Sequence, residues 1–197
     1  MTSSPIWLER TELLINNENL EKLAQLNVLI VGLGGVGSFA AEFLARAGIG
    51  IMTIVDGDVV DITNTNRQLP AMHSTVGKSK AVLMQERLLD INPALRLRTI
   101  NQFINPEESS HLVNSEAYDY VLDCIDSVTP ELLLIKAAKE KGCKIISSMG
   151  AGGKVDSMMI KYADISKTHI CPFAYYIRKR LRHEGIYGGV MTVFSEE

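Results

Sequence analysis

Residues 29–58 read LIVGLGGVGSFAAEFLARAGIGIMTIVDGD and decide the fold. An apolar run leads into a glycine cluster, an amphipathic segment closed by Gly48, and a second apolar run that ends in acid. This pattern predicts a strand, a phosphate-binding loop, a helix and a second strand, because glycines permit a tight turn and leave the first helix amides free to face an anion. The cluster consists of Gly32, Gly34, Gly35 and Gly37. Asp56 follows it by roughly 20 residues, where a carboxylate can accept hydrogen bonds from ribose hydroxyls.

Composition predicts an ordinary soluble globular protein. The 197 residues are 46% hydrophobic and 22% charged, with a formal net charge of −3, which favours one domain spanning residues 1–197. No apolar run is long enough to cross a bilayer, and the opening MTSSPIWLERTELL lacks the pattern of a signal peptide. We therefore expect a cytoplasmic protein with no membrane partner.

The cysteines form no CxxC pair and are expected to be reduced thiols, with Cys124 and Cys143 in the core.

Strand and helix patterns alternate along the remaining chain. Strands are predicted at 95–100, 120–126, 144–149 and 190–197, and helices within 81–91, 105–117, 129–142 and 173–185. The predicted helix within 105–117 begins at Asn105, with Pro106 in its first position. The predicted helix within 129–142 begins at Thr129-Pro130. Strands and helices at this spacing predict a Rossmann-like, doubly wound, mainly parallel sheet with a mixed C-terminal part.

Three polar groups follow predicted strand ends, where ligands bind in doubly wound folds. They are the glycine loop, residues 56–80, and residues 123–127. Arg67 and Lys80 in the second group can neutralise phosphate oxygens, and a carboxylate in the third can hold Mg²⁺. These residues favour ATP with Mg²⁺ over a nicotinamide cofactor. An NAD-dependent oxidoreductase stays as a third alternative, although no second domain for hydride chemistry is visible.

The same motifs resemble a known family. GLGGVG, DGD, NTNRQ, VGKSK and DCIDS together are similar to the adenylate-forming domain of the ThiF, MoeB and HesA superfamily, the ubiquitin-activating (E1-like) enzymes. The resemblance covers the chain from Arg10 onward. It implies that a substrate carboxylate attacks the α-phosphate of ATP, giving an acyl adenylate and pyrophosphate.

The resemblance also implies roles for individual residues. Asp56 would hold the ribose, Asp126 would coordinate Mg²⁺, and Arg10 would enter the partner subunit's site, which implies a homodimer. Further contacts to ATP are implied for Gly32, Gly34, Gly35, Gly37, Asp58, Asn64, Arg67, Gln68, Lys80 and Ser127. Arg67, Lys80, Asp126 and Arg10 would take part in catalysis.

A narrower resemblance rests on TNTNRQ, GAGGKVD, ADISKT and VFSEE, which look like the tRNA threonylcarbamoyladenosine dehydratase (TcdA or CsdL) branch. That branch activates the threonylcarbamoyl carboxylate on adenosine 37 of tRNA, which then cyclises with loss of water. The chain lacks the paired CxxC zinc sites of sulfur-carrier-activating relatives, and Cys171 precedes Pro172 where the branch commonly has an acid. Because branch members extend beyond VFSEE, we expect a C-terminal extension to be missing.

The basic segment IRKRLRH has two interpretations. It could be a tRNA-facing surface, since Lys and Arg supply most sequence-independent affinity for nucleic acids, or simply a solvated helix face. The candidate tRNA contacts are Arg178, Lys179, Arg180 and Arg182. The main alternative function is adenylation of the C-terminal glycine of a ubiquitin-like sulfur carrier of ThiS or MoaD type, which would make a carrier or sulfur-transfer protein the partner.

Overall fold

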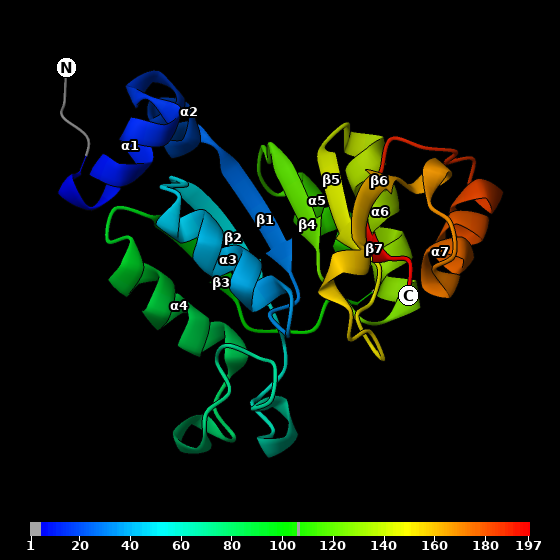
Figure 1. Cartoon of the computed structure of the whole chain (residues 1–197), viewed down its shortest axis with the longest axis horizontal. Helices are drawn as coiled ribbons and strands as arrows, with labels where there is room; N and C mark the ends of the chain where they lie inside the picture. Colours follow the sequence, from blue (N-terminus) through cyan, green and yellow to red (C-terminus); the bar gives the residue numbers. More distant parts are fainter. Residues whose placement is uncertain (1–4, 106) are drawn as a thin grey trace. The chain divides into compact units, whose positions relative to one another are not determined.

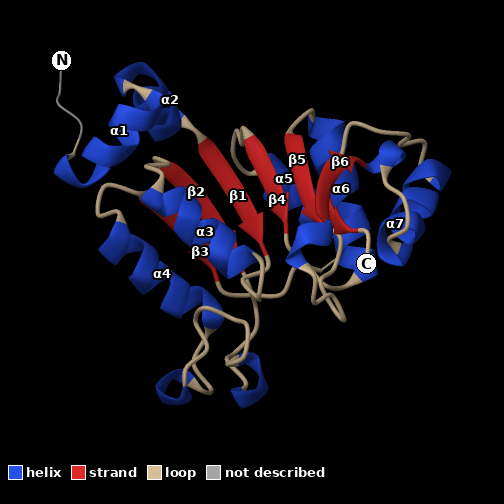
Figure 2. Cartoon of the chain, viewed as in Figure 1, coloured by secondary structure: helices blue, strands red, loops and turns tan. Residues whose placement is uncertain are grey.

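The computed structural model describes residues 5–105 and 107–197 (Figures 1 and 2). The chain divides into two compact units, Met1–Phe103 and Ile104–Glu197, and each is described by itself. Pro106, the predicted first residue of a helix, lies outside the described residues, as do residues 1–4 of the N-terminal segment. The single-domain assignment for residues 1–197 stays a prediction.

The first unit is a parallel β-sheet with helices, in the order that the hydrophobic pattern predicts. Its strands are β1 (Asn27–Val31), β2 (Ile51–Val55) and β3 (Arg96–Ile100), arranged β3-β2-β1. Its helices are η1 (Ile6–Leu8), α1 (Glu9–Ile15), α2 (Asn17–Gln25), α3 (Gly37–Arg46), η2 (Ile62–Asn64), η3 (His73–Thr75) and α4 (Lys80–Ile91).

Burial explains this arrangement. Every residue of β1 is buried, as the core strand of a parallel sheet requires, whereas β3 alternates and lies outermost in the β3-β2-β1 order. Ala41 and Ala45 of α3 and Met84 and Leu88 of α4 are fully buried at helical spacing. The core therefore holds the end of β1, and the loop that follows it, in a fixed place.

The second unit carries the mixed part of the sheet. It contains α5 (Glu108–Asn114), β4 (Tyr120–Asp123), α6 (Val128–Lys141), β5 (Lys144–Ser148), η4 (Ser157–Met159), β6 (Ile160–Asp164), η5 (Ile165–Lys167), α7 (Pro172–His183) and β7 (Met191–Ser195). The strand order is β4-β5-β7-β6. β7 runs parallel to β5 and antiparallel to β6, which confirms the predicted fold class.

Two details differ from or extend the sequence interpretation. Cys124 and Cys143 are half-buried rather than core residues, because each lies at the end of an element, and Cys171 is the buried cysteine. Within the described ranges, no helix is both long and apolar enough to cross a membrane.

Candidate nucleotide site

The glycine loop follows β1 directly and turns tightly. Gly32 has φ of +91°, a conformation that favours glycine, and its N–H donates to Val55 O at 2.8 Å. A Cβ on Gly35 would lie 3.5 Å from both Cγ and the carbonyl oxygen of Arg67. The glycines therefore let the turn that carries Arg67 contact the loop.

The loop ends at the N-terminus of α3. Ser38 Oγ donates to Gly34 O at 2.6 Å and fixes the first turn. Within the part of the chain that the structure describes, the N–H groups of Gly35, Val36 and Gly37 donate to no protein acceptor. Unpaired N–H groups at the positive end of a helix form a ready site for an anion such as phosphate.

Asp56 lies at the end of β2 and binds the loop. Its Oδ2 accepts from Leu33 N at 2.6 Å, and its Oδ1 accepts from Asp58 N at 2.7 Å. Burial raises the pKa of Asp56, although both backbone hydrogen bonds and nearby Lys80 act in the opposite direction. Each carboxylate oxygen has a second lone pair, so Asp56 can also accept hydrogen bonds from hydroxyl groups of a ligand.

Lys80 is a buried cation at the start of α4. Its Nζ lies 2.8 Å from Asp58 Oδ2, and only 5% of its side chain is exposed, whereas 55% of the Asp58 side chain is exposed. A short antiparallel contact, Val59 with Ser79, brings the two segments together, and Lys80 N donates to Asp58 O at 3.0 Å. A buried ammonium with one exposed carboxylate partner can neutralise added negative charge.

Three further predicted residues lie in one turn beside the loop. Asn64 Oδ1 accepts from Asp61 N at 3.1 Å, which closes η2. Arg67 is exposed, and its Nη1 donates to Thr63 O at 3.2 Å and Asn66 Oδ1 at 2.8 Å. Gln68 Oε1 is buried without a hydrogen-bond partner among the described residues, and its Nε2 lies 3.7 Å from the Cβ position of Gly34. An orphaned buried amide beside the glycine loop fits a ligand that would complete its hydrogen bonds.

The second unit holds a buried carboxyl pair at the end of β4. Ser147 Oγ lies 2.8 Å from Asp123 Oδ2 and 3.0 Å from Glu131 Oε1, and all three residues are buried. Burial is the main cause that raises the pKa of both acids, to about 7 for Asp123 and about 9 for Glu131. Since one hydroxyl has one proton to donate, this geometry suits a neutral Glu131 that donates through Ser147 to Asp123. The pair also fixes the following loop, because Ile125 N donates to Asp123 Oδ1 at 3.2 Å.

The predicted metal ligand follows this pair. Asp126 is exposed, and Ser127, the N-cap of α6, donates from Oγ to Asp126 Oδ1 at 3.4 Å. No group of three or more His, Cys, Asp or Glu side chains suited to a metal occurs in the described ranges. One carboxylate and one hydroxyl still fit Mg²⁺, which usually takes one or two carboxylates and completes its shell with water and substrate phosphates.

Burial raises the pKa of neighbouring Cys124 to about 12, which makes its thiol a poor nucleophile.

The structure therefore brings together, within the first unit, the glycine loop, Asp56, Asp58, Lys80 and the turn from Asn64 to Gln68. Asp126 and Ser127 belong to the second unit. Arg10 lies on α1, exposed and without an ion pair among the described residues. Lys179, Arg180 and Arg182 are exposed on α7, while Arg178 Nη1 donates to Thr168 O at 2.9 Å.

Sequence reasoning missed Glu131 and Ser147. Glu131 follows Thr129-Pro130 in the first turn of a helix, where an acid is normally interpreted as a partner of the helix dipole. Ser147 lies within an apolar strand with no motif around it. A buried acid opposite a strand serine has no signature in the order of residues.

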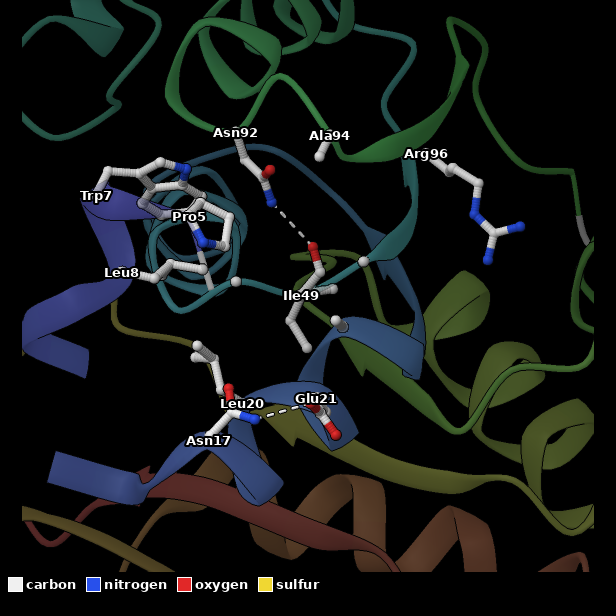
Figure 3. Close-up of a pocket in the computed structure, with 13 residues that line it drawn as sticks. Pro5, Trp7, Leu8, Asn17, Leu20, Glu21, Ile49, Asn92, Ala94 and Arg96 are labelled. Carbon is white, nitrogen blue, oxygen red and sulfur yellow. Dashed lines mark hydrogen bonds between the residues drawn. The ribbon is translucent and has the colours of Figure 1, made fainter. Parts of the chain in front are cut away.

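The described first unit also contains a pocket of about 330 Å³ that is separate from these loops (Figure 3). Trp7, Leu8 and Leu20 line it together with the segments that precede β2 and β3. Asn92 Nδ2 donates to Ile49 O at 3.1 Å across its wall. It lies at the N-terminal ends of the strands, whereas the predicted nucleotide residues follow the C-terminal ends, so it is not the phosphate site.

A parallel β-α-β unit with a glycine loop, an acid after the second strand and a buried lysine defines the nucleotide-binding α/β class of proteins. The chain belongs to the ThiF family, whose model matches residues 8–195. It is 46% identical, over 188 residues, to the tRNA threonylcarbamoyladenosine dehydratase of Bacillus subtilis (strain 168), a match that covers 95% of this chain and 74% of that protein.

Solved structures agree with this assignment. The Escherichia coli tRNA N6-threonylcarbamoyladenosine dehydratase in complex with ATP is similar with a TM-score of 0.91 and 38% identity, over 100% of this chain and 85% of that one. The same enzyme in complex with AMP is similar with a TM-score of 0.90 and 38% identity, over 100% and 84%. The resemblance predicted from the motifs, to the superfamily and to its dehydratase branch, is confirmed.

Proposed function

We propose that this chain is an ATP-dependent tRNA threonylcarbamoyladenosine dehydratase, which adenylates the threonylcarbamoyl carboxylate on adenosine 37 of tRNA. The observation that carries the proposal is the similarity, over nearly the whole chain, to dehydratases of two bacteria, one of which binds ATP and AMP. The loop cluster of the first unit supplies the chemistry that such a reaction needs.

The nucleotide would bind along the loops of the first unit. The free N–H groups of the glycine loop and of the α3 N-terminus would contact phosphate, and Asp56 would accept hydrogen bonds from the ribose. Arg67, Lys80 and Asn64 would contact the phosphate chain. The unpaired Gln68 Oε1 would accept a hydrogen bond from a hydroxyl or amino group of the nucleotide. Asp58 would hold Lys80 in place through the ion pair at 2.8 Å.

Magnesium would be held by Asp126 and Ser127. When bound, it would lower the negative charge of the phosphate oxygens. The buried pair of Asp123 and Glu131 would keep the loop from Cys124 to Ser127 in one conformation, because Asp123 accepts the Ile125 N–H.

The reaction balances in two steps. A carboxylate oxygen attacks the α-phosphorus of ATP, the new C–O–P linkage forms, and pyrophosphate leaves. An atom of the ureido group in the same threonylcarbamoyl unit then attacks the activated carbonyl carbon and gives up one N–H proton to solvent. A ring bond forms, the bond from that carbon to the bridging oxygen breaks, and AMP leaves with that oxygen. The modified nucleoside loses the elements of water, and AMP and pyrophosphate are the coproducts.

Arg67 and Lys80 would contribute most in the first step. Negative charge accumulates around the α-phosphorus in its transition state, and cations and oriented N–H groups stabilise it there. Lys80 is already desolvated, so little reorganisation is needed as the charge grows. Arg67 is exposed, and it would reach the phosphates by giving up its two local hydrogen bonds.

We also propose a homodimer in which Arg10 of one protomer enters the site of the other. This would explain an exposed arginine on α1 beside the exposed apolar side chains of Leu13 and Leu14, which are 82% and 83% exposed.

Because ATP and tRNA are the proposed substrates, we place the activity in the cytoplasm. A sulfur-transfer or ubiquitin-like carrier protein is a secondary partner candidate.

Pyrophosphate exchange into ATP tests the proposal. We expect exchange to be stimulated by tRNA bearing threonylcarbamoyladenosine and to be indifferent to a Gly-Gly-ended carrier protein. Stimulation by the carrier alone would favour the sulfur-carrier alternative. Nicotinamide binding without ATP binding would overturn both and favour an oxidoreductase.

A further inference from the structure

Helix α7, which is labelled in Figure 1, carries basic and aromatic residues that the nucleotide chemistry does not use. Ala174, Ile177 and Leu181 are buried at helical spacing, so one side of the helix packs on the second unit. The opposite side, which we name the α7 outer face, consists of exposed residues Tyr175, Tyr176, Lys179, Arg180, Arg182 and His183.

The helix contains no acidic residue to offset this charge. Glu184 follows it directly, and its carboxylate lies 2.7 Å from Lys136 Nζ, so it is already paired. Cations near a helix C-terminus also stabilise the helix dipole, which accounts for Arg182 and His183. The dipole does not account for two exposed tyrosines in the first half of the helix, 59% and 43% exposed.

Each of these tyrosines is held by an arginine. The guanidinium of Arg178 lies 5.6 Å from the centre of the Tyr175 ring, and that of Arg180 lies 5.9 Å from the Tyr176 ring. Arg180 Nη1 also donates to the Tyr176 hydroxyl at 3.1 Å. The two rings are therefore oriented before any partner binds.

Arg178 is itself fixed by the backbone. Its Nη1 donates to the carbonyl oxygens of Thr168 at 2.9 Å and Ile165 at 3.4 Å, and it also contacts the Thr168 hydroxyl. These bonds hold Nη1 of the guanidinium in place, so Arg178 can position Tyr175. An arginine fixed in this way reduces the entropy that Tyr175 loses on binding.

We propose that the α7 outer face binds the single-stranded loop of a tRNA, with Tyr175 and Tyr176 stacking on unpaired bases and Lys179 and Arg182 contacting phosphates. Exposed aromatic rings among cations are the recognised combination for single-stranded nucleic acid, since every base has a face that can stack and the backbone is anionic. A fully paired duplex offers only its phosphates to such a surface. The inference rests on the proposed function, in which the modified adenosine lies in a tRNA loop.

Direct binding measurements with the full chain test this inference. The probes are a stem-loop RNA whose unpaired loop has about seven nucleotides, within the range of about 4–16 nucleotides that single-strand sites cover, and a paired duplex of equal phosphate number. We expect Tyr175→Ala and Tyr176→Ala each to weaken stem-loop binding about fivefold to a hundredfold, while duplex binding stays within about twofold. Tyr175→Phe and Tyr176→Phe should bind the stem-loop like the original chain, because the ring is retained.

Two controls separate stacking from charge and from loss of fold. Tyr162→Ala removes a more exposed tyrosine on β6, 80% exposed, and should change neither affinity. Lys179→Ala and Arg182→Ala should weaken binding of both RNAs alike. Each should also reduce the slope of log affinity against log salt concentration by about one. Thermal unfolding and far-ultraviolet circular dichroism of every variant report whether the second unit, which carries α7, stays folded.

The inference is overturned if the Tyr→Ala variants bind the stem-loop like the original chain, or if they lose stem-loop and duplex binding equally. Tyrosine variants that bind normally, in a chain that still dehydrates modified tRNA, refute the α7 role and leave the proposed function intact. If the original chain has no dehydratase activity but its Tyr→Ala variants selectively lose stem-loop binding, RNA binding is supported and the proposed reaction is refuted.

Discussion

The Asp56 carboxylate accepts a 2.6 Å hydrogen bond from the backbone N–H of Leu33, 23 residues earlier in the chain. This bond ties the end of β2 to the glycine loop that follows β1. Asp56 therefore shapes the loop, in addition to the proposed role in which its oxygen atoms bind a nucleotide. The sequence pattern predicts the second role, and the structure adds the first.

Replacing Asp56 tests this double role. Asp56→Asn turns one carboxylate oxygen into an N–H₂ group that faces a backbone donor, so we expect the free energy of unfolding to fall by about 1–3 kcal/mol. ATP affinity should fall about tenfold or more. Urea unfolding and nucleotide titration measure the two effects. Asp90→Asn, an exposed acid on α4, is the control and should change neither quantity. Normal stability of Asp56→Asn would contradict the loop-shaping role.

Two lysines two residues apart give a matched comparison. Lys80 is buried and paired with Asp58, whereas Lys78 is exposed. Lys80→Met retains much of the apolar stem but removes the charge, so we expect adenylate formation to fall about a hundredfold to a thousandfold, the usual cost of losing one transition-state donor. Lys78→Met should stay within about twofold. Equal losses in the two variants would argue against a specific role for Lys80.

The buried carboxyl pair predicts how stability depends on pH. The pKa of Glu131 is raised to about 9 and that of Asp123 to about 7, both well above the ordinary carboxyl range near 4. Between pH about 4 and pH about 9, the folded chain therefore binds more protons than the unfolded chain. The contribution of the pair to the free energy of unfolding is complete below pH about 4 and is lost as the pH rises through about 7 and 9.

Glu131→Gln should flatten this dependence. It removes one titrating group and keeps a side chain of similar shape, so the fall in unfolding free energy from pH about 6 to about 9 should become shallower. Urea unfolding at several pH values measures the slope. Glu140→Gln, on the exposed side of the same helix, should keep the original slope. An unchanged slope in Glu131→Gln would mean that Glu131 is ionised in the fold.

Mixing two inactive variants tests the proposed role of Arg10 in the partner's site. Arg10→Ala and Lys80→Met should each be inactive alone. If dimers re-form at random, half are mixed, and each mixed dimer has one site with both native residues, so activity should return to about a quarter of the original. Activity in the mixture that stays at the level of the separate variants, after exchange of subunits has been verified, would contradict a contribution across the interface.

The strand and helix order was predictable because hydrophobic periodicity and glycine positions are local properties of the chain. Local motifs also pointed to Asp56 and Lys80, and their roles toward a nucleotide stay predictions. The burial of Glu131 was not predictable from local motifs, since it depends on Ser147, which is 16 residues away in sequence. The use of Arg178 was not predictable either, because its carbonyl partners lie in η5 and the loop after it, and only folding brings them under α7.

The most direct test of the account follows the fate of one oxygen atom. tRNA whose threonylcarbamoyl carboxylate carries heavy oxygen is incubated with ATP and the full chain, and the products are analysed by mass spectrometry. If the carboxylate is adenylated, the modified nucleoside loses water and the label appears in AMP, because the bridging oxygen leaves with it. Label in inorganic phosphate with ADP as coproduct, or loss of water without ATP, would contradict adenylation.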